Sequence, residues 1–291
     1  MADPLIVEVA INGWMTKETN PHIPLSADEV IASCTACFEA GAQIIHAHAG
    51  DAFVGDVQRH ESKPYLDAFG PVQRAYPDAI LYPTLPGGGP DITMDDRYAH
   101  MRELLAAGLL KMAPIDPGTM NWGLRDAGGA PKPSDTIYQN TVNDVAYSFA
   151  FCRDNALIST LSIFEPGFLQ LVLAHQRGGN LPKATVVKLE FSDGPLIYGL
   201  PASALSLDAY LAMLEGSGIP WMVNLRQGDL MDGFGEIAIA RGGHVRVGIE
   251  DYGGNRIPRN EELVAEIVAL GHRLGRPPAR HDEVSSLLTV G

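Results

Sequence analysis

Short apolar segments and longer amphipathic segments alternate eight times along the chain. Many of the short segments are apolar on both faces and rich in β-branched residues, which is typical of parallel strands covered by helices. Eight strand–helix units are the number that closes a (β/α)8 barrel. The predicted strands cover residues 5–11, 43–47, 79–84, 110–115, 157–163, 185–191, 221–225 and 245–249. The predicted helices cover residues 27–39, 63–75, 94–106, 141–154, 167–177, 207–215, 231–240 and 260–274.

The predicted fold class is α/β, with residues 1–291 forming one (β/α)8 TIM barrel domain and residues 275–291 a C-terminal extension of it. A doubly wound open sheet is the alternative, but the glycine-rich turn that usually follows its first strand is missing. Ser26 to Glu29 form a capping box that predicts the start of the first helix. The connection 116–140 is long, and long connections in compact domains are often functional.

The 291 residues carry a formal net charge of −14, which disfavours nucleic acid and anionic membrane surfaces as partners. No apolar stretch reaches the ~18 residues of a membrane-spanning helix, and the first residues do not resemble a signal peptide. Three cysteines in a chain of this length predict reduced thiols and a cytoplasmic location. Cys34 and Cys37 share one face of the first predicted helix, and we interpret them as small buried side chains.

His46 and His48 form a His-x-His motif at the end of the second predicted strand. Residues two apart in a strand project from the same face, so both imidazoles can converge on one metal ion. Active sites of this barrel collect at the carboxyl ends of its strands, which supports a metal site. The alternative is a pair of hydrogen-bonded histidines at the barrel rim.

A second candidate site lies in the last predicted strand, where residues 243–251 read Gly-His-Val-Arg-Val-Gly-Ile-Glu-Asp. The alternation places Arg246 and Glu250 on one face of the strand. An arginine inside an apolar barrel needs an anionic partner, because an unpaired buried charge is costly. Glu250 could complete a metal site, and Asp251 could pair with Arg246. A structural ion pair that closes the barrel is the alternative.

Two loops have residues that suit ligand binding. Thr84 precedes a glycine run that includes Gly87 and Gly88, where a ligand can approach the backbone and the next helix begins. Thr119 and Asn121 provide polar donors after the fourth predicted strand. Each loop is predicted either to bind substrate or to be a plain connection.

Taken together, these segments resemble the β-keto acid cleavage enzyme family, with the motifs in the same order along nearly the whole chain. The most specific motif is the last-strand segment that contains Arg246, Glu250 and Asp251. The matching segments are residues 10–13, 20–24, 41–48, 87–89, 118–123, 164–167, 243–251, 260–264 and 275–277.

The resemblance implies a barrel enzyme, usually a homotetramer, that binds Zn²⁺ through His46, His48 and Glu250. It implies that a β-keto acid reacts with acetyl-CoA to give acetoacetate and a new acyl-CoA. In that reaction Asp251, positioned by Arg246, would be the general base. Thr84 stands where the family has a serine, and it would contact substrate.

The chain departs from the family at several positions near the predicted site. Gly50 replaces a common arginine. Trp14, which we predict to lie at the substrate site, and Met15 stand where members acting on amino-substituted acids have an acidic residue. Thr160 and Ser162 replace acids found in some members on the fifth strand, and Pro114 replaces a hydroxyl residue on the fourth. These departures favour a neutral, aromatic or anionic acyl group over a cationic one.

Two other functions are weighed against this one. A metal-dependent hydrolase of the amidohydrolase type also places His-x-His on a barrel strand, but it needs further histidines on later strands. His175 lies in a predicted helix and His244 near the start of its strand, at the wrong end of the barrel. A catalytically silent protein that binds a metal or CoA is the third hypothesis.

Overall fold

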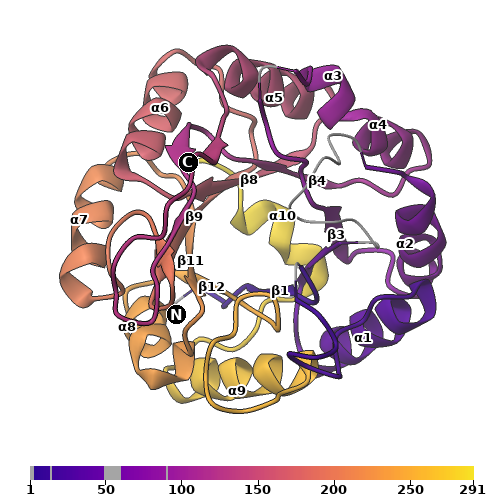
Figure 1. The fold of residues 1–291 in the computed structure, drawn as a ribbon. Helices are drawn as coiled ribbons and strands as arrows, with labels where there is room; N and C mark the ends of the chain where they lie inside the picture. Colours follow the sequence, from indigo (N-terminus) through magenta and orange to yellow (C-terminus); the bar gives the residue numbers. More distant parts are fainter. Residues whose placement is uncertain (1–2, 14, 49–59, 90) are drawn as a thin grey trace.

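The computed structural model describes residues 3–13, 15–48, 60–89 and 91–291, which form a barrel of parallel strands surrounded by helices (Figure 1). The strand order is β3-β2-β1-β12-β11-β9-β8-β4, and the two end strands, β3 and β4, lie beside each other. The barrel is therefore nearly closed, and the predicted fold class is confirmed. Its strands are β1 (Val7–Ala10), β2 (Ile44–Ala47), β3 (Ile80–Pro83), β4 (Met112–Ile115), β8 (Ile158–Ile163), β9 (Thr185–Ser192), β11 (Trp221–Arg226) and β12 (His244–Val247).

The helices pack on the outer face of the barrel, over side chains such as Val7 and Val9 of β1. The predicted capping box is present, since the Ser26 side chain accepts a hydrogen bond from the backbone N–H of Glu29. The helices are α1 (Ala27–Ala40), α2 (Lys63–Ala75), α3 (Met94–Arg97), α4 (Ala99–Ala106), α5 (Val142–Asp154), α6 (Pro166–Arg177), α7 (Ala204–Leu214), α8 (Phe234–Ala240) and α9 (Asn260–Arg273), with a 3₁₀ turn η1 (Leu230–Asp232).

The helix predicted over residues 94–106 is interrupted at Tyr98, so this part of the prediction is wrong. Tyr98 has φ −98° and ψ 3°, which ends α3 before α4 begins. Its side chain is fully buried, and its hydroxyl donates a hydrogen bond to the carbonyl of Pro114, 3.2 Å away. A contact with a distant strand thus overrides the local helical pattern.

The long connection after β4 contains short strands that were not predicted. Within it, β5 (Met120–Asn121) pairs with β7 (Ile137–Tyr138). The strand β6 (Gly123–Leu124) pairs with β10 (Leu196–Ile197), which follows β9. The connection is thereby tied to the carboxyl-terminal side of the barrel, where β4 and β9 end.

The lower part of the barrel interior is apolar and is closed by the C-terminal segment. Residues 275–291 include the turn η2 (His281–Glu283) and helix α10 (Val284–Leu287), which lies across the barrel in Figure 1. Val284 and Leu288 of this segment join a buried cluster with inward side chains of the barrel strands. The strand members of the cluster are Ile6, Ile44, Ile80, Tyr82, Met112, Ile158, Val186 and Met222.

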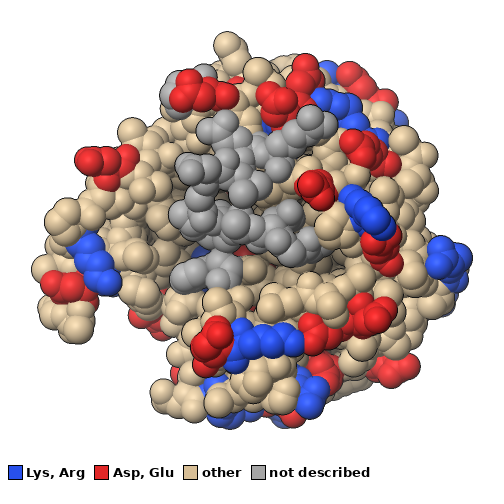
Figure 2. Space-filling model, turned by 45° about the vertical axis from the view of Figure 1, so that its right-hand side comes forward, with Lys and Arg blue, Asp and Glu red and all other residues tan. Residues whose placement is uncertain are grey.

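The described surface carries charges of both signs, and the cysteines lie in the interior (Figure 2). No described helix is both long and apolar enough to span a membrane. On the face shown in Figure 2, acidic and basic side chains of the described residues are interspersed. Cys34, Cys37 and Cys152 are buried and free, which confirms the interpretation of the first two as small core side chains.

Candidate metal centre

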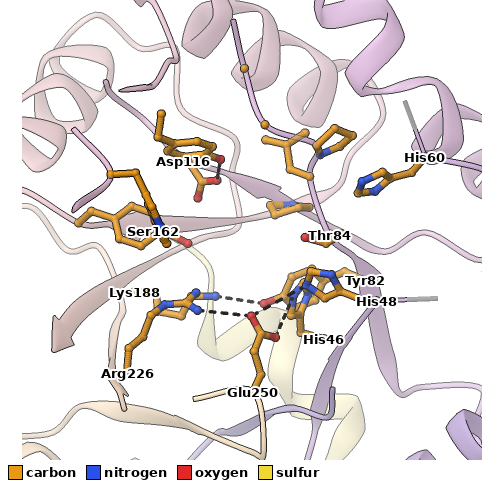
Figure 3. Close-up of a pocket in the computed structure, with 18 of the residues that line it drawn as sticks. His46, His48, His60, Tyr82, Thr84, Asp116, Ser162, Lys188, Arg226 and Glu250 are labelled. Carbon is orange, nitrogen blue, oxygen red and sulfur yellow. Dashed lines mark hydrogen bonds and ion pairs between the residues drawn. The ribbon is translucent and has the colours of Figure 1, made fainter. Parts of the chain in front are cut away.

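His46, His48 and Glu250 meet at the carboxyl-terminal mouth of the barrel (Figure 3). One potential ligand atom from each residue lies within 4.8 Å of the other two. His46 Nε2 is 3.5 Å from Glu250 Oε2, and His48 Nε2 is 3.9 Å from Glu250 Oε1. All three side chains are buried. The juxtaposition that the sequence predicted is therefore present.

The strand register and the turn after it place each of these side chains. His46 follows Ile44 on the inward face of β2 and is in register with Ala10 of β1. Just beyond β2, the Asn12 side chain fixes the backbone of His48: Asn12 Nδ2 donates to the His48 carbonyl at 2.6 Å, and its Oδ1 accepts from the His48 N–H at 2.8 Å. The second histidine is held in place although the regular strand has ended.

Two glycines make room for Glu250. A Cβ atom on Gly13 would lie 2.2 Å from Glu250 Cγ, and one on Gly248 would lie 2.1 Å from the carbonyl oxygen of Ala10. Both glycines also have positive φ, 62° and 131°, which side chains rarely adopt. The close approach of β1 to the turn after β12 therefore depends on glycine at these two positions.

The ionisation states of His46 and Glu250 suit a metal ion. Burial, reinforced by the charge of Arg246, lowers the pKa of His46 well below its usual value, so the imidazole stays neutral. Burial opposes ionisation of Glu250, but Arg246, His48, Arg226 and Lys188 outweigh it and lower the pKa of Glu250 to about 2. Neutral imidazoles and an ionised carboxylate are the forms that bind metals.

The free atoms and the spacing also fit zinc. Glu250 Oε2 accepts no hydrogen bond from the described residues. Zinc bonds of ~2.0–2.1 Å at tetrahedral angles place neighbouring donors about 3.3 Å apart, close to the observed separation of His46 and Glu250. Two histidines and a glutamate form a known type of catalytic zinc site that leaves a coordination position open.

Glu250 and six other buried ionisable residues lie together at the barrel mouth, and we call them the mouth cluster: Glu8, Lys188, Glu190, Arg226, Arg246, Glu250 and Asp251. Arg246 and Arg226 approach Glu250 Oε1 at 3.2 and 3.4 Å, while Oε2 faces His46. Glu250 thus combines the two roles that the sequence left as alternatives. One oxygen is held by arginines, and the other is available to a metal ion.

Asp251 pairs with both arginines of the cluster. Arg246 Nε lies 2.7 Å from Asp251 Oδ2, which confirms the predicted contact, and an Arg226 nitrogen lies 3.2 Å from Oδ1. Asp251 is not among the residues that line the main cavity at the mouth, whereas Arg246, Arg226 and Glu250 are. The predicted base therefore lies behind guanidinium groups that face the cavity.

This cavity has a volume of about 260 Å³ and extends from the histidines toward the long connection after β4. Three residues predicted to bind substrate line this cavity, namely Thr84, Gly87 and Gly88. Thr119 and Asn121 do not: the Thr119 hydroxyl donates to the carbonyl of Asn140, and Asn121 is exposed on β5. Trp14, like Gly50, lies outside the described residues.

Several cavity residues were missed in the sequence. Lys188 and Arg226 come from β9 and β11, and His60 and Asp116 also line the cavity. Burial, reinforced by His48, lowers the pKa of His60 to about 4. Lys188 Nζ lies 3.1 Å from Glu8 Oε1. Lys188 and Arg226 could have been predicted as charged residues at inward positions of apolar strands. Only Arg246 was predicted on that basis.

Comparisons with known proteins agree with this site. The 3-keto-5-aminohexanoate cleavage enzyme of Fusobacterium nucleatum is 28% identical over 296 residues, covering 100% of this chain and 99% of that protein. The 3-oxoadipate:acetyl-CoA acetyltransferase of Cupriavidus necator is 25% identical and covers 99% and 95%. The solved complex of ObcA with oxaloacetate has a TM-score of 0.68 at 16% identity, covering 92% of this chain and 67% of that one, which shows a shared fold.

A family model also matches nearly the whole chain. The model of the beta-keto acid cleavage enzyme family matches residues 4–290, a range that contains every described residue of the mouth cluster. The amidohydrolase alternative is set aside on this ground. The chain belongs to the beta-keto acid cleavage enzyme family.

Proposed function

We propose that this enzyme uses Zn²⁺, bound by His46, His48 and Glu250, to convert a β-keto acid and acetyl-CoA into acetoacetate and a new acyl-CoA. The observation that carries the proposal is the convergence of two imidazoles, of which that of His46 is neutral, and one ionised carboxylate at a buried barrel mouth. The cavity of about 260 Å³ beside them has room for a small acid. The Cupriavidus necator relative is a 3-oxoadipate:acetyl-CoA acetyltransferase, which supports acetyl-CoA as the co-substrate.

Different residues of the chain have different roles in the proposed reaction. A bound zinc ion would supply Lewis-acid stabilisation of the negative charge that develops as the substrate loses its α proton. Lys188, Arg226 and Arg246 line the same end of the cavity and favour a carboxylate there. Thr84 and the glycines after it form the wall along which substrate and thioester approach.

Asp251 is the proposed general base, with Arg246 as its positioning partner. Proton transfer to Asp251 requires that one guanidinium contact at its oxygens gives way when substrate binds. The α carbon then attacks the acetyl thioester carbonyl and CoA leaves as a thiolate. The thiolate attacks the β-keto carbon, and the bond between that carbon and the α carbon breaks to give the new acyl-CoA. The acetoacetate carbanion takes back the proton from Asp251 and is released.

We further propose a cytoplasmic homotetramer, as the family resemblance implies. Sedimentation of the purified protein tests the assembly: a single species of four chains supports it, and a monomer at micromolar concentration contradicts it.

A reaction screen tests the proposed activity. The purified zinc-loaded protein is incubated with acetyl-CoA and a panel of β-keto acids, and products are identified by mass spectrometry. Formation of acetoacetate together with one acyl-CoA per turnover supports the proposal. Hydrolysis of esters or amides, or binding of acetyl-CoA without any turnover across the panel, would overturn it.

A further inference from the structure

We propose that Asp116 determines substrate specificity by accepting a hydrogen bond from a hydroxyl or ammonium group at the far end of the acyl chain. This inference rests on the proposed function and deepens it by naming the substrate class: β-keto acids with a hydrogen-bond donor on the acyl group. The same carboxylate disfavours substrates that carry a second carboxylate. This differs from the sequence-based expectation, which favoured a neutral, aromatic or anionic acyl group, because that expectation did not include Asp116 among the cavity residues.

Asp116 occupies a typical specificity position of a barrel enzyme. It directly follows β4, at the carboxyl-terminal end of the strand. Figure 3 shows its carboxylate across the cavity from His46 and His48, with Ser162 on the same side. A β-keto acid with its carboxylate and keto groups near the histidines would therefore direct its acyl chain toward Asp116.

The Asp116 carboxylate can accept more hydrogen bonds than the described residues donate to it. The Tyr138 hydroxyl donates a hydrogen bond to Oδ2. Burial and the charge of Asp116 raise the pKa of Tyr138 well above its usual value, so this hydroxyl remains a donor. An ionised carboxylate can accept about four hydrogen bonds. No described lysine, arginine or histidine forms an ion pair with Asp116.

The apolar surroundings of Asp116 favour a substrate that donates a hydrogen bond to its carboxylate. Trp122, Ile137 and Phe164 line the same cavity with apolar surface, and water excluded by a bound acyl chain cannot solvate the carboxylate. A plain alkyl chain would leave the carboxylate with fewer partners than it has in water. A hydroxyl or ammonium group replaces the lost water contact, and a carboxylate adds repulsion.

The two ends of the cavity differ in charge, which fixes the orientation of the substrate. Lys188, Arg226 and Arg246 line the metal end. Among the described lining residues, Asp116 is the one carboxylate apart from the proposed metal ligand Glu250. A substrate with a carboxylate at one end and a donor at the other matches this arrangement in one direction only.

The test uses four β-keto acids of equal chain length that end in a methyl, hydroxyl, ammonium or carboxylate group. We expect kcat/KM for the hydroxyl or ammonium substrate to exceed that for the methyl substrate by about 10-fold or more. The carboxylate substrate should be the poorest of the four. In Asp116→Asn the ratio to the methyl substrate should fall toward one. Because each value is a ratio measured on one preparation, partial misfolding of a variant cancels.

Two further variants complete the design. Tyr138→Phe removes the partner of Asp116 but keeps the carboxylate, so the preference should persist. Asp135→Asn makes the same chemical change at an exposed site on the same connection and should leave all four rates unchanged. Equal turnover of the methyl and donor substrates, or an equal loss on all four in Asp116→Asn, would show that Asp116 only braces the connection. If none of the four yields acetoacetate, the proposed function itself fails, and this inference fails with it.

Discussion

The lower and upper halves of the barrel interior are built from the same strands, yet they differ completely in chemistry. The inward-facing residues at the lower level are apolar: Ile6 just before β1, Ile44 in β2 and Val186 in β9. Two residues later, the inward positions hold Glu8, His46 and Lys188. Because strand side chains alternate with a period of two, a step of two residues along these three segments separates the packed core from the polar site.

The difference indicates that stability and chemistry are separable along the barrel axis. The lower half is closed by Val284 and Leu288 and gains stability from burial. The upper half holds charges whose burial is costly unless each is paired, and it opens into the cavity. Substitutions in the upper half should remove activity, whereas those in the lower half should reduce stability and leave the metal site intact.

The largest expected effect is at His46. In His46→Ala we expect most of the zinc, and with it nearly all turnover, to be lost, because one of three protein ligands is removed. Metal content of the purified protein, measured by mass spectrometry, checks this. His272→Ala, an exposed histidine at the end of α9, is the matched control and should keep its zinc. Full zinc occupancy in His46→Ala would refute the ligand assignment.

Asp251→Asn should separate metal binding from proton transfer within the upper half. We expect zinc to be retained and kcat to fall by about 10²–10⁴-fold, because the amide cannot act as the base. The isosteric change keeps a partner for Arg246, 2.7 Å away in the native protein. Loss of zinc in this variant would instead indicate that Asp251 holds Glu250 in place through the arginines.

Ile44→Ala tests the lower half on the strand that carries His46. Removing a fully buried side chain should lower the free energy of unfolding by about 2–5 kcal/mol. The zinc content and kcat of the folded fraction should stay near those of the unmodified protein. Denaturant unfolding, combined with a metal assay, checks both. A large drop in zinc with little loss of stability would mean that the halves are coupled.

The smallest expected effect concerns His244, at the lower end of β12. Its Nδ1 accepts the Ile6 N–H at 3.1 Å, and burial, with a contribution from Arg276, lowers its pKa from 6.5 to about 3. The unfolded chain takes up this proton near pH 6.5, so the stabilisation is complete above that pH and is lost as the pH falls toward 3. We expect a loss of about 1–2 kcal/mol between pH 7 and pH 5.

His244→Asn keeps an acceptor but removes the titration. Its unfolding free energy should therefore change less over this pH range than that of the unmodified protein. Parallel slopes for the two proteins would show that His244 does not contribute to the acid sensitivity.

The sequence predicted the eight strands because each is a short apolar run between helical patterns, a local property of the chain. The position of His46 and His48 at the end of a predicted strand also indicated a candidate metal site, whereas Glu250 as its third ligand came from the family resemblance. Tyr98 shows where such reasoning stops. The helix break there is associated with a hydrogen bond to the carbonyl of Pro114 on the next strand, and the local sequence pattern does not predict it.

The residues that line the cavity are hard to predict for the same reason, because contacts between distant parts of the chain bring them together. Glu8 and Lys188 are visible as charges in apolar strands, but their partnership at 3.1 Å joins residues 180 positions apart. His60 and Asp116 line the cavity only because the barrel brings their segments together. Thr119, which has a donor in a suitable loop, instead bonds within its own connection.

The composition of the mouth cluster has a kinetic consequence. Four carboxylates share this region with three cationic side chains, so the metal-free cluster has an excess of negative charge. The members that line the cavity, however, are Lys188, Arg226, Arg246 and Glu250, so a keto acid meets a positively charged wall. Under the proposed function, a keto acid bound against this wall and the metal ion should slow the escape of the ion to a chelator.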